Sequence, residues 1–521
     1  MKEFNVTGQC IPTEHYMVDI SGKISQIKEL IDKGRYFTIN RARQYGKTTT
    51  LYELRRHLSD EYTVVQISFQ GFDDDSFESS ENFCDVFVKS IATALKFSTA
   101  AKEYIEKWED ATVKDFNALG KHITKMCEEK KIVLLVDEVD RTSNNRVFLK
   151  FLDMLRSKFL ARNAGDDYTF HSVILAGVYD IKNIKLKMMS EGLHTPTAIE
   201  DKIYNSPWNI AVSFKVDMSF SPDEISTMLK AYESDRNTGM DITAIAEEIH
   251  SYTSGYPFLV SRVCQCIDEE LAQEWTLEGV RSSVKIIIEE RNTLFDDLVK
   301  NLENNKELYD FIYSLLIVGE RKTYSANNPT ISLGEMFNII SRSNGKIIVS
   351  NKIFETVISD YFVSKSENAK PSTEVVERGG IIKNGRFDME LCLRKFAEHY
   401  ADIYAKKTAA FVEREGKFLF LTYIRPLLNG QGFYHFESQL SDERRMDIVV
   451  DFGREQFIIE LKIWRGEKYE ESAHEQLCGY LEAKKADTGY LLTFDFRKGA
   501  KKEPRGEWIE VEGKRIFDVI V

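Results

Sequence analysis

The stretch YFTIN (residues 36–40) is a short, β-branched apolar run, and RARQYGKTT (residues 41–49) follows it directly. The next segment places Leu51, Leu54 and Leu58 at helical spacing. A strand, a loop and a helix in this order direct backbone N–H groups and a helix N-terminus toward one point, where they can bind anionic oxygens. The sequence therefore predicts a phosphate-binding loop between the strand and the helix.

Individual residues of this loop have predicted roles. Gly46 permits close approach of the backbone to a phosphate, Lys47 would reach the β- and γ-phosphates, and the Thr48 hydroxyl would ligate Mg²⁺. Arg41 stands where the general pattern G-x-x-x-x-G-K-[ST] has its first glycine. Because of that departure, the Gly-Lys-Thr tripeptide is a weak signal by itself.

A second element strengthens the prediction. The segment KIVLLVDEVDR (residues 131–141) is an apolar strand that ends in Asp137 and Glu138. We expect Asp137 to hold Mg²⁺ through water and Glu138 to polarise the attacking water, since an acid in this place can meet the metal from a neighbouring strand. The alternative, an acidic pair that only caps a helix, is disfavoured by the loop upstream.

Together these motifs resemble the AAA-ATPase-like family of bacterial ATP-binding proteins, which use an R-x-R-x-x-G-K-[ST] variant of the loop. The resemblance makes Arg41 a family feature, and Arg43 and Thr49 become further candidate nucleotide-binding residues. It implies an α/β P-loop ATPase of the additional-strand type, with a further strand between the loop strand and the acidic strand. Further strand-length apolar runs fit this layout, at residues 63–69, 172–176 and 209–212.

The segment SGYPFLVSRVC (residues 254–264) resembles the Gly-x-Pro lid motif of related ATPases. This resemblance puts Gly255 and Pro257 near the adenine and makes Arg262 a candidate phosphate sensor. A solvated helix arginine is an equally good interpretation of Arg262. Asp180 follows the fourth predicted strand, where a sensor residue is usual, and its role stays open.

A second constellation lies near the C-terminus, on two strand-like runs at residues 447–450 and 456–462. As antiparallel neighbours, the runs would bring the carboxylates of Asp447 and Glu460 to one metal, and such hard oxygen ligands suit Mg²⁺ or Mn²⁺. Lys462 follows Glu460 by two residues and shares its face of the strand. From there Lys462 can orient a water and offset charge on a scissile phosphate.

Two features make this spacing more specific. Glu460 and Lys462 interrupt the apolar run FIIELKIW (residues 457–464), and charges inside a buried strand are costly unless they serve a site. Downstream, Gln476 and Tyr480 are four residues apart on a predicted helix and so share a face.

These residues resemble the PD-(D/E)XK nuclease superfamily, particularly its RecB-like branch with a Q-x-x-x-Y helix. By that resemblance Asp447 and Glu460 are metal ligands and Lys462 is catalytic. The same resemblance makes Gln476 and Tyr480 residues that support the site or contact DNA.

The two resemblances cover nearly the whole chain and imply its domain order. We expect an ATPase core at residues 1–220, a helical lid at 221–300, a module compatible with a winged helix at 301–368, and a nuclease-like α/β domain at 381–521. The polar residues 364–380 are the expected linker. Glu415, on a helix ahead of the last strands, is a weaker candidate for a further acid of the nuclease-like site.

Composition limits the class of protein. The 521 residues are 43% hydrophobic and 29% charged with only nine Pro, a profile typical of packed globular domains. The chain shows no leader or membrane-spanning run, and its seven Cys are scattered, so we expect a cytoplasmic protein with reduced thiols. Residues 381–521 account for −1 of the net charge of −13, and residues 1–380 carry the rest. Because a strongly acidic surface repels nucleic acid, we expect any nucleic acid to bind the C-terminal part.

We therefore expect an ATPase whose nucleotide binding and hydrolysis control a metal-dependent nuclease, acting in defence or DNA processing. ATP and Mg²⁺ are the expected cofactors, and Mn²⁺ also suits the nuclease-like site. The alternative is a nucleotide-switched protein whose nuclease-like domain binds nucleic acid or a partner without cleavage. We expect no membrane partner, and the sequence leaves the oligomeric state open.

Overall fold

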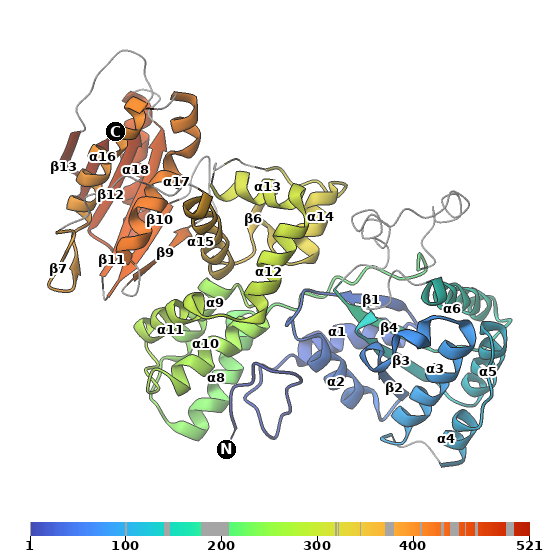
Figure 1. Ribbon diagram of the computed structural model, residues 1–521. Helices are drawn as coiled ribbons and strands as arrows, with labels where there is room; N and C mark the ends of the chain where they lie inside the picture. Colours follow the sequence, from blue (N-terminus) through green and yellow to red (C-terminus); the bar gives the residue numbers. More distant parts are fainter. Residues whose placement is uncertain are drawn as a thin grey trace. The chain divides into compact units, whose positions relative to one another are not determined.

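The computed structural model describes residues 2–98, 102–139, 146–178, 208–317, 320, 322–343, 345–369, 380–406, 409–428, 432–437, 447–453, 455–463, 467–495 and 505–521. The chain divides into two compact units, and Figure 1 labels the helices and strands along it. The first unit comprises residues 1–250, 255–265 and 336–338, and the second comprises residues 251–254, 266–335 and 339–521.

A parallel four-stranded sheet forms the centre of the first unit. Its strands are β1 (Tyr36–Asn40), β2 (Thr63–Ser68), β3 (Ile132–Asp137) and β4 (Ser172–Gly177), in the spatial order β1-β4-β3-β2. β4 thus lies between the loop strand and the acidic strand, which confirms the predicted additional-strand layout. Every residue of β3 and β4 is buried, as expected when helices cover both faces of a parallel sheet.

The helices of this unit supply that cover. They are α1 (Ser21–Asp32), α2 (Lys47–Leu58), α3 (Ser80–Leu95), α4 (Lys102–Glu109), α5 (Phe116–Glu129) and α6 (Arg146–Ala164), with short 3-10 turns at Phe69–Gly71 and Asp74–Phe77. α3, α5 and α6 share one apolar core with β2, β3 and β4, in which the rings of Phe83 and Phe87 pack against Phe151. α2 contacts β2 and β3 and packs against α1.

Residues 209–212 do not form the predicted strand. Only Val212 pairs with the sheet, through an isolated bridge to Phe37 in which its N–H donates to the Tyr36 carbonyl at 2.9 Å. Trp208 is fully buried beside the Tyr36 ring, and the Ala211 N–H turns back to the Trp208 carbonyl. The apolar character of this segment therefore reflects a buried turn.

Helices occupy the region of the predicted lid. They are α8 (Pro222–Arg236), α9 (Ile242–Thr253), α10 (Pro257–Glu269) and α11 (Leu277–Glu289). α8 begins with a capping box, in which the Ser221 side chain accepts from the Glu224 N–H and the Glu224 carboxylate accepts from the Ser221 N–H. The division into two units passes through this region, so the domain bounds drawn from the sequence stay predictions.

The second unit continues with α12 (Thr293–Asn304), α13 (Lys306–Leu316), α14 (Pro329–Met336), the hairpin of β5 (Ile340–Ser343) and β6 (Lys346–Val349), and α15 (Lys352–Ala369). This order is compatible with a winged helix, which stays a prediction. α15 extends to Ala369, so the first part of the expected linker is helical, and residues 370–379 lie outside the described residues.

The C-terminal part of the second unit is a mixed six-stranded sheet. Its strands are β9 (Gly432–Glu437), β10 (Asp447–Phe452), β11 (Glu455–Ile463), β12 (Thr488–Phe494), β13 (Arg505–Val511) and β14 (Lys514–Ile520), in the order β13-β14-β12-β11-β10-β9. β12 runs parallel to β11 and to β14, and the other pairs are antiparallel. A two-stranded ribbon of β7 (Ile382–Lys383) and β8 (Arg386–Phe387) precedes it.

Three helices cover this sheet: α16 (Met389–Lys406), α17 (Ala409–Leu428) and α18 (Glu467–Ala483). α18 shares an apolar core with one face, where Leu477 meets Val449 and Leu491, while Phe396 of α16 packs on Phe494. Among the described residues, we find no helix that is both long and apolar enough to cross a membrane.

Candidate functional site

The predicted phosphate-binding loop joins β1 to α2. Gly46 precedes the helix with φ of 74°, a left-handed conformation that favours glycine. The Lys47 side chain is buried, and its ammonium group donates to the carbonyl oxygens of Arg41 at 3.0 Å and Ala42 at 2.9 Å. The ammonium group thus lies inside the loop, where a phosphate would compete with these carbonyls for it.

β3 brings the predicted acidic residues to this loop. The Thr48 hydroxyl donates to Asp137 Oδ2 at 2.8 Å, and the other carboxylate oxygen accepts from the Glu138 N–H at 2.9 Å. Glu138 has φ of 55°, so the backbone bends into the left-handed region directly after the strand. A hydroxyl and a carboxylate placed together are the hard oxygen donors that Mg²⁺ prefers.

Arg41 has a structural role in the place of the missing glycine. Its guanidinium donates to the carbonyls of Asn40 and Val216, each at 2.8 Å, and lies 5.5 Å from the centroid of the Phe214 ring. Burial lowers the pKa of Arg41 from its ordinary value. Arg41 therefore fastens the loop to the segment that leads into α8.

A cavity of about 350 Å³ adjoins the loop, a size within the range of small-ligand pockets. The loop contributes residues 44–46, Thr49 and Thr50 to its wall. The N-terminal segment contributes the largest share, and the segment from Met218 to α10 completes the wall with Met218, Phe220, Met228, Pro257, Phe258 and Ser261.

The residues of the predicted lid motif fall in different places. Pro257 lines the cavity, and a Cβ added to Gly46 would lie 3.9 Å from it. Gly255 has φ of 71°, and a Cβ there would lie 2.0 Å from the Phe220 carbonyl oxygen, so only glycine fits. Among the described residues that line the cavity, neither Gly255 nor Arg262 occurs. Arg262 Nη1 instead donates to Gln265 at 3.4 Å, and its role stays a prediction.

The Arg43 side chain is exposed, and it is the Arg43 carbonyl that makes a described contact, accepting from the Tyr256 hydroxyl at 2.5 Å. The side-chain contribution of Arg43 to nucleotide binding therefore stays a prediction. Asp180 lies outside the described residues.

Sequence reasoning missed the N-terminal wall of the cavity. Asn5, Cys10, Tyr16 and Val18 are among its members, and the Cys10 N–H donates to the Thr49 hydroxyl at 3.2 Å. This segment carries no periodic pattern or motif that could have indicated the role. Its place depends on tertiary packing, in which Tyr16 joins a ring cluster with α8.

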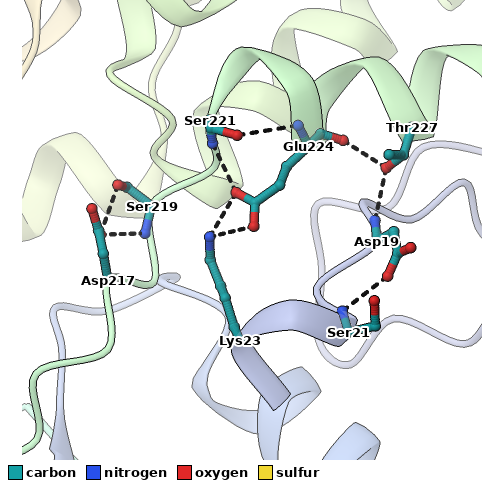
Figure 2. A network of polar contacts seen from close by, with 8 residues as sticks. All are labelled: Asp19, Ser21, Lys23, Asp217, Ser219, Ser221, Glu224 and Thr227. Carbon is teal, nitrogen blue, oxygen red and sulfur yellow. Dashed lines mark hydrogen bonds and ion pairs between the residues drawn. The ribbon is translucent and has the colours of Figure 1, made fainter. Parts of the chain in front are cut away.

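A polar network links α1 and the residues before it to the start of α8 (Figure 2). Lys23 Nζ donates to the two carboxylate oxygens of Glu224 at 2.5 and 2.6 Å. The side chains are 10% and 23% exposed, so the ion pair is largely shielded from water. Alongside it, the Asp19 N–H donates to the Thr227 hydroxyl at 2.8 Å.

The nuclease-like site lies on the sheet face that α18 covers. Glu460 is 1% exposed, and Lys462 Nζ lies 3.1 Å from Glu460 Oε1 while donating to Gln476 Oε1 at 3.2 Å. A carboxylate buried this deeply needs a compensating charge, which Lys462 supplies. Tyr480 is buried one helical turn after Gln476. The structure thus brings together Glu460, Lys462 and Gln476 as the sequence predicts.

The strand register aligns acidic positions across three strands. Extending the antiparallel register of β10 and β11 by one residue places Asp447 opposite Glu460, and β9 pairs Glu437 with Asp447. Glu437 was missed because its place depends on strand register. The side chains of Asp447 and Glu437, and that of Glu415 on α17, lie outside the part of the structure that is described. Among the described side chains, no three His, Cys, Asp or Glu residues gather as a metal site.

Residues 11–362 match the sequence profile of a family described as an AAA-like domain, which is more than half of the chain. The chain belongs to this AAA-like family. Residues 433–505 match the PD-(D/E)XK nuclease superfamily, so the AAA-like protein also carries a domain of that superfamily. Both resemblances found in the sequence are thereby confirmed.

Solved structures similar to the AAA-like chain include a Walker-type ATPase of Pyrococcus abyssi, with 12% identity and a TM-score of 0.47, covering 68% of this chain and 99% of that one. The ORC2 protein of Aeropyrum pernix in ADPNP–ADP complexes has 11% identity and a TM-score of 0.36, covering 69% and 98%. An uncharacterised WD repeat-containing protein of Synechocystis sp. is 20% identical over 258 residues, 46% of this chain and 20% of the relative. The chain therefore spans about a fifth of that relative.

Proposed function

We propose that this protein binds and hydrolyses ATP with Mg²⁺ at the phosphate-binding loop, and that its nucleotide state controls metal-dependent cleavage of nucleic acid by the C-terminal domain. The observation that carries the nuclease half is the contact of Glu460 with Lys462 and of Lys462 with Gln476 on a buried sheet face. A buried charge pair of this kind is weak evidence of stability, since an apolar pair would stabilise the sheet as well or better. Its presence therefore favours a functional role.

The ATPase half rests on the arrangement around α2. Lys47 lies where it can exchange loop carbonyls for the β- and γ-phosphates, and Thr48 with Asp137 offers oxygen ligands for Mg²⁺. Glu138 directly follows Asp137 and would polarise the attacking water. These assignments use only groups that the fold brings to one edge of the sheet.

In the nuclease-like domain, Glu460 and Asp447 would hold a divalent ion, which when bound supplies Lewis acidity at the scissile phosphate. Lys462 would hold the attacking water and offset charge on the phosphate. Gln476 accepts from Lys462 and so fixes the direction of the ammonium group. The hard oxygen donors of this set fit Mg²⁺ or Mn²⁺.

A second candidate function is nucleotide-switched binding of nucleic acid or a partner without cleavage. One observation favours it: the Lys462 ammonium group is already engaged by Glu460 and Gln476. In this case the nuclease fold would serve as a binding surface, and a resemblance of fold does not decide between the two.

The two candidates separate in a cleavage assay. Full-length protein is incubated with supercoiled and linear DNA, single-stranded DNA and RNA, with Mg²⁺ or Mn²⁺, with and without ATP. We expect cleavage that Glu460→Gln abolishes and that Glu510→Gln, the same change at an exposed position of the same sheet, leaves intact. Retained binding without cleavage of any substrate would establish the binding function instead.

A further inference from the structure

Tyr252 lies at the end of α9, in the short segment 251–254 that belongs to the second unit. Its ring is 3% exposed and meets the His435 imidazole of β9, with 5.5 Å between the ring centroids and an edge-on angle of 71°. Lys352 of α15 places its ammonium group 5.3 Å from the centroid of the same ring. A residue of the lid region is thus in contact with the edge strand of the nuclease-like sheet.

His435 is in turn part of a buried polar contact within that sheet. The imidazole is 2% exposed, and its Nδ1 lies 3.2 Å from Asp451 Oδ2 on β10. The other carboxylate oxygen of Asp451 accepts from Gln456 Nε2 at 2.8 Å, and Arg281 of α11 acts on the same carboxylate through its charge. A displacement of His435 would therefore alter its contact with Asp451 on β10.

α15 holds the same edge strand through Tyr434. The Thr356 hydroxyl donates to the Tyr434 carbonyl at 3.2 Å, and the Tyr434 hydroxyl donates to Asp360 at 2.8 Å. The strand that these contacts hold also carries Glu437, two residues beyond His435, and Glu437 pairs in register with Asp447. We call the aligned positions Glu437, Asp447 and Glu460 the acidic row. The strands that contact the lid region, β9 and β10, therefore also carry two positions of the acidic row.

On the other side of Tyr252, the chain reaches the phosphate-binding loop within four residues. In the first unit, the Tyr256 hydroxyl donates to the Arg43 carbonyl, and the Tyr256 ring packs edge-on against Tyr45 at 4.8 Å. Gly255 lies between Tyr252 and Tyr256 in the chain, and its carbonyl accepts from the Phe220 N–H at 2.8 Å. Within the first unit, Gly255 and Tyr256 are therefore held against Phe220 and the phosphate-binding loop.

We propose that residues 252–256 transmit the nucleotide state of the phosphate-binding loop to β9, and through β9 and β10 to the acidic row, with Tyr252 and His435 as positioning residues. The inference rests on the proposed function and names how ATP regulates the nuclease-like site. Bound phosphates would draw Lys47 away from the Arg41 and Ala42 carbonyls and so rearrange this part of the loop. The next residue is Arg43, whose carbonyl accepts from the Tyr256 hydroxyl.

Hydrogen exchange of the full-length protein tests this route without requiring cleavage. Backbone exchange in residues 432–437 and 447–452 is compared without nucleotide, with ADP and with a slowly hydrolysed ATP analogue. We expect the analogue to change exchange there by about threefold or more in the wild type. Tyr252→Leu should remove that difference while nucleotide affinity stays within about twofold.

His435→Gln provides a milder variant, since the amide can still donate to Asp451 while the ring that Tyr252 meets is gone. The matched control is Tyr423→Leu on α17, the same change at a similarly buried tyrosine whose ring packs against Phe396 and His399. The proposal is overturned if β9 and β10 do not respond to nucleotide in the wild type, or if both Tyr252→Leu and His435→Gln respond as the wild type does. Absence of cleavage in the substrate assay would instead overturn the nuclease function, so the two failures are separate.

Discussion

The Thr48 hydroxyl donates to Asp137 at 2.8 Å although 89 positions separate the two residues in the chain. The contact exists because β1 and β3 lie in one parallel sheet, with β4 between them, and their carboxyl ends meet at one edge. It places the two predicted magnesium ligands together before any nucleotide enters. The loop and the acidic strand can therefore be tested as one site.

Replacing Lys47 with Ala removes the ammonium group that lies inside the loop. We expect ATP affinity to fall by about 20-fold or more, equivalent to roughly 1.8 kcal/mol. Isothermal titration with ATP measures the affinity, and Lys33→Ala, at an exposed lysine directly after α1, is the control. Unchanged affinity in the Lys47 variant would contradict the assignment.

Glu138→Gln keeps the hydrogen-bonding shape of the side chain and loses its basicity. Because Asp137 and Thr48 remain, we expect ATP to bind normally while hydrolysis falls by about 100-fold or more. Steady-state phosphate release together with nucleotide affinity tests both parts. Normal turnover would show that another group polarises the water.

Gly255→Ala introduces a Cβ that would lie 2.0 Å from the Phe220 carbonyl oxygen, at a backbone φ of 71°. We expect a loss of about 3 kcal/mol or more in the free energy of unfolding, or failure to fold. Gly22→Ala is the matched control, since a Cβ on Gly22 meets nothing within 4 Å and lies in a helix. That change should be neutral or stabilising by up to about 1 kcal/mol in a denaturant titration.

Asp451 predicts a dependence of stability on pH. Burial raises the pKa of this carboxyl, but the hydrogen bond and charge of His435, the Gln456 amide and the charge of Arg281 outweigh it, so the pKa lies below the ordinary 3.8. A depressed folded-state pKa contributes stability that is fully present above about pH 4 and is lost as the pH falls through the folded value. We expect the melting-temperature gap between wild type and Asp451→Asn to narrow in acid. The control is Asp487→Asn, the same change at an exposed position.

A divalent ion should stabilise the nuclease-like domain. If Glu460 and Asp447 share an ion, Mg²⁺ or Mn²⁺ raises the melting temperature of the nucleotide-free protein, because binding to the folded state alone stabilises it. Glu460→Gln should lose this shift and Glu510→Gln should keep it. Lys462→Ala should also keep the shift yet lose cleavage. If neither Mg²⁺ nor Mn²⁺ changes the melting temperature of the wild type, the result would favour the alternative of binding without cleavage.

The phosphate-binding loop could be predicted because its signal is local: a strand, a Gly-Lys-Thr turn and an amphipathic helix are adjacent in the chain. The shared strand face of Glu460 and Lys462 was equally accessible, since a spacing of two fixes the face of the side chains. The contact of Lys462 with Gln476 depends on how the helix packs on the sheet, and the spacings do not fix it. In both places the local preference agrees with the tertiary structure.

Other features depend on partners that the sequence does not name. Residues 209–212 have the composition of a strand, but the burial of Trp208 bends the chain there. The N-terminal wall of the cavity mixes polar and apolar residues without periodicity, so only its packing against α8 reveals it. Glu437 becomes notable only when the register of β9 with β10 is known.

Arg41 has an evolutionary consequence. Its side chain donates to the Val216 carbonyl and lies over the Phe214 ring, so the loop and the segment before α8 depend on each other for their position. Restoring the common glycine at position 41 would leave the Val216 carbonyl without this donor and free the loop from its anchor. We therefore expect positions 41 and 214 to covary among homologues, since the ring contact depends on both side chains, and a consensus loop grafted into this chain to impair it.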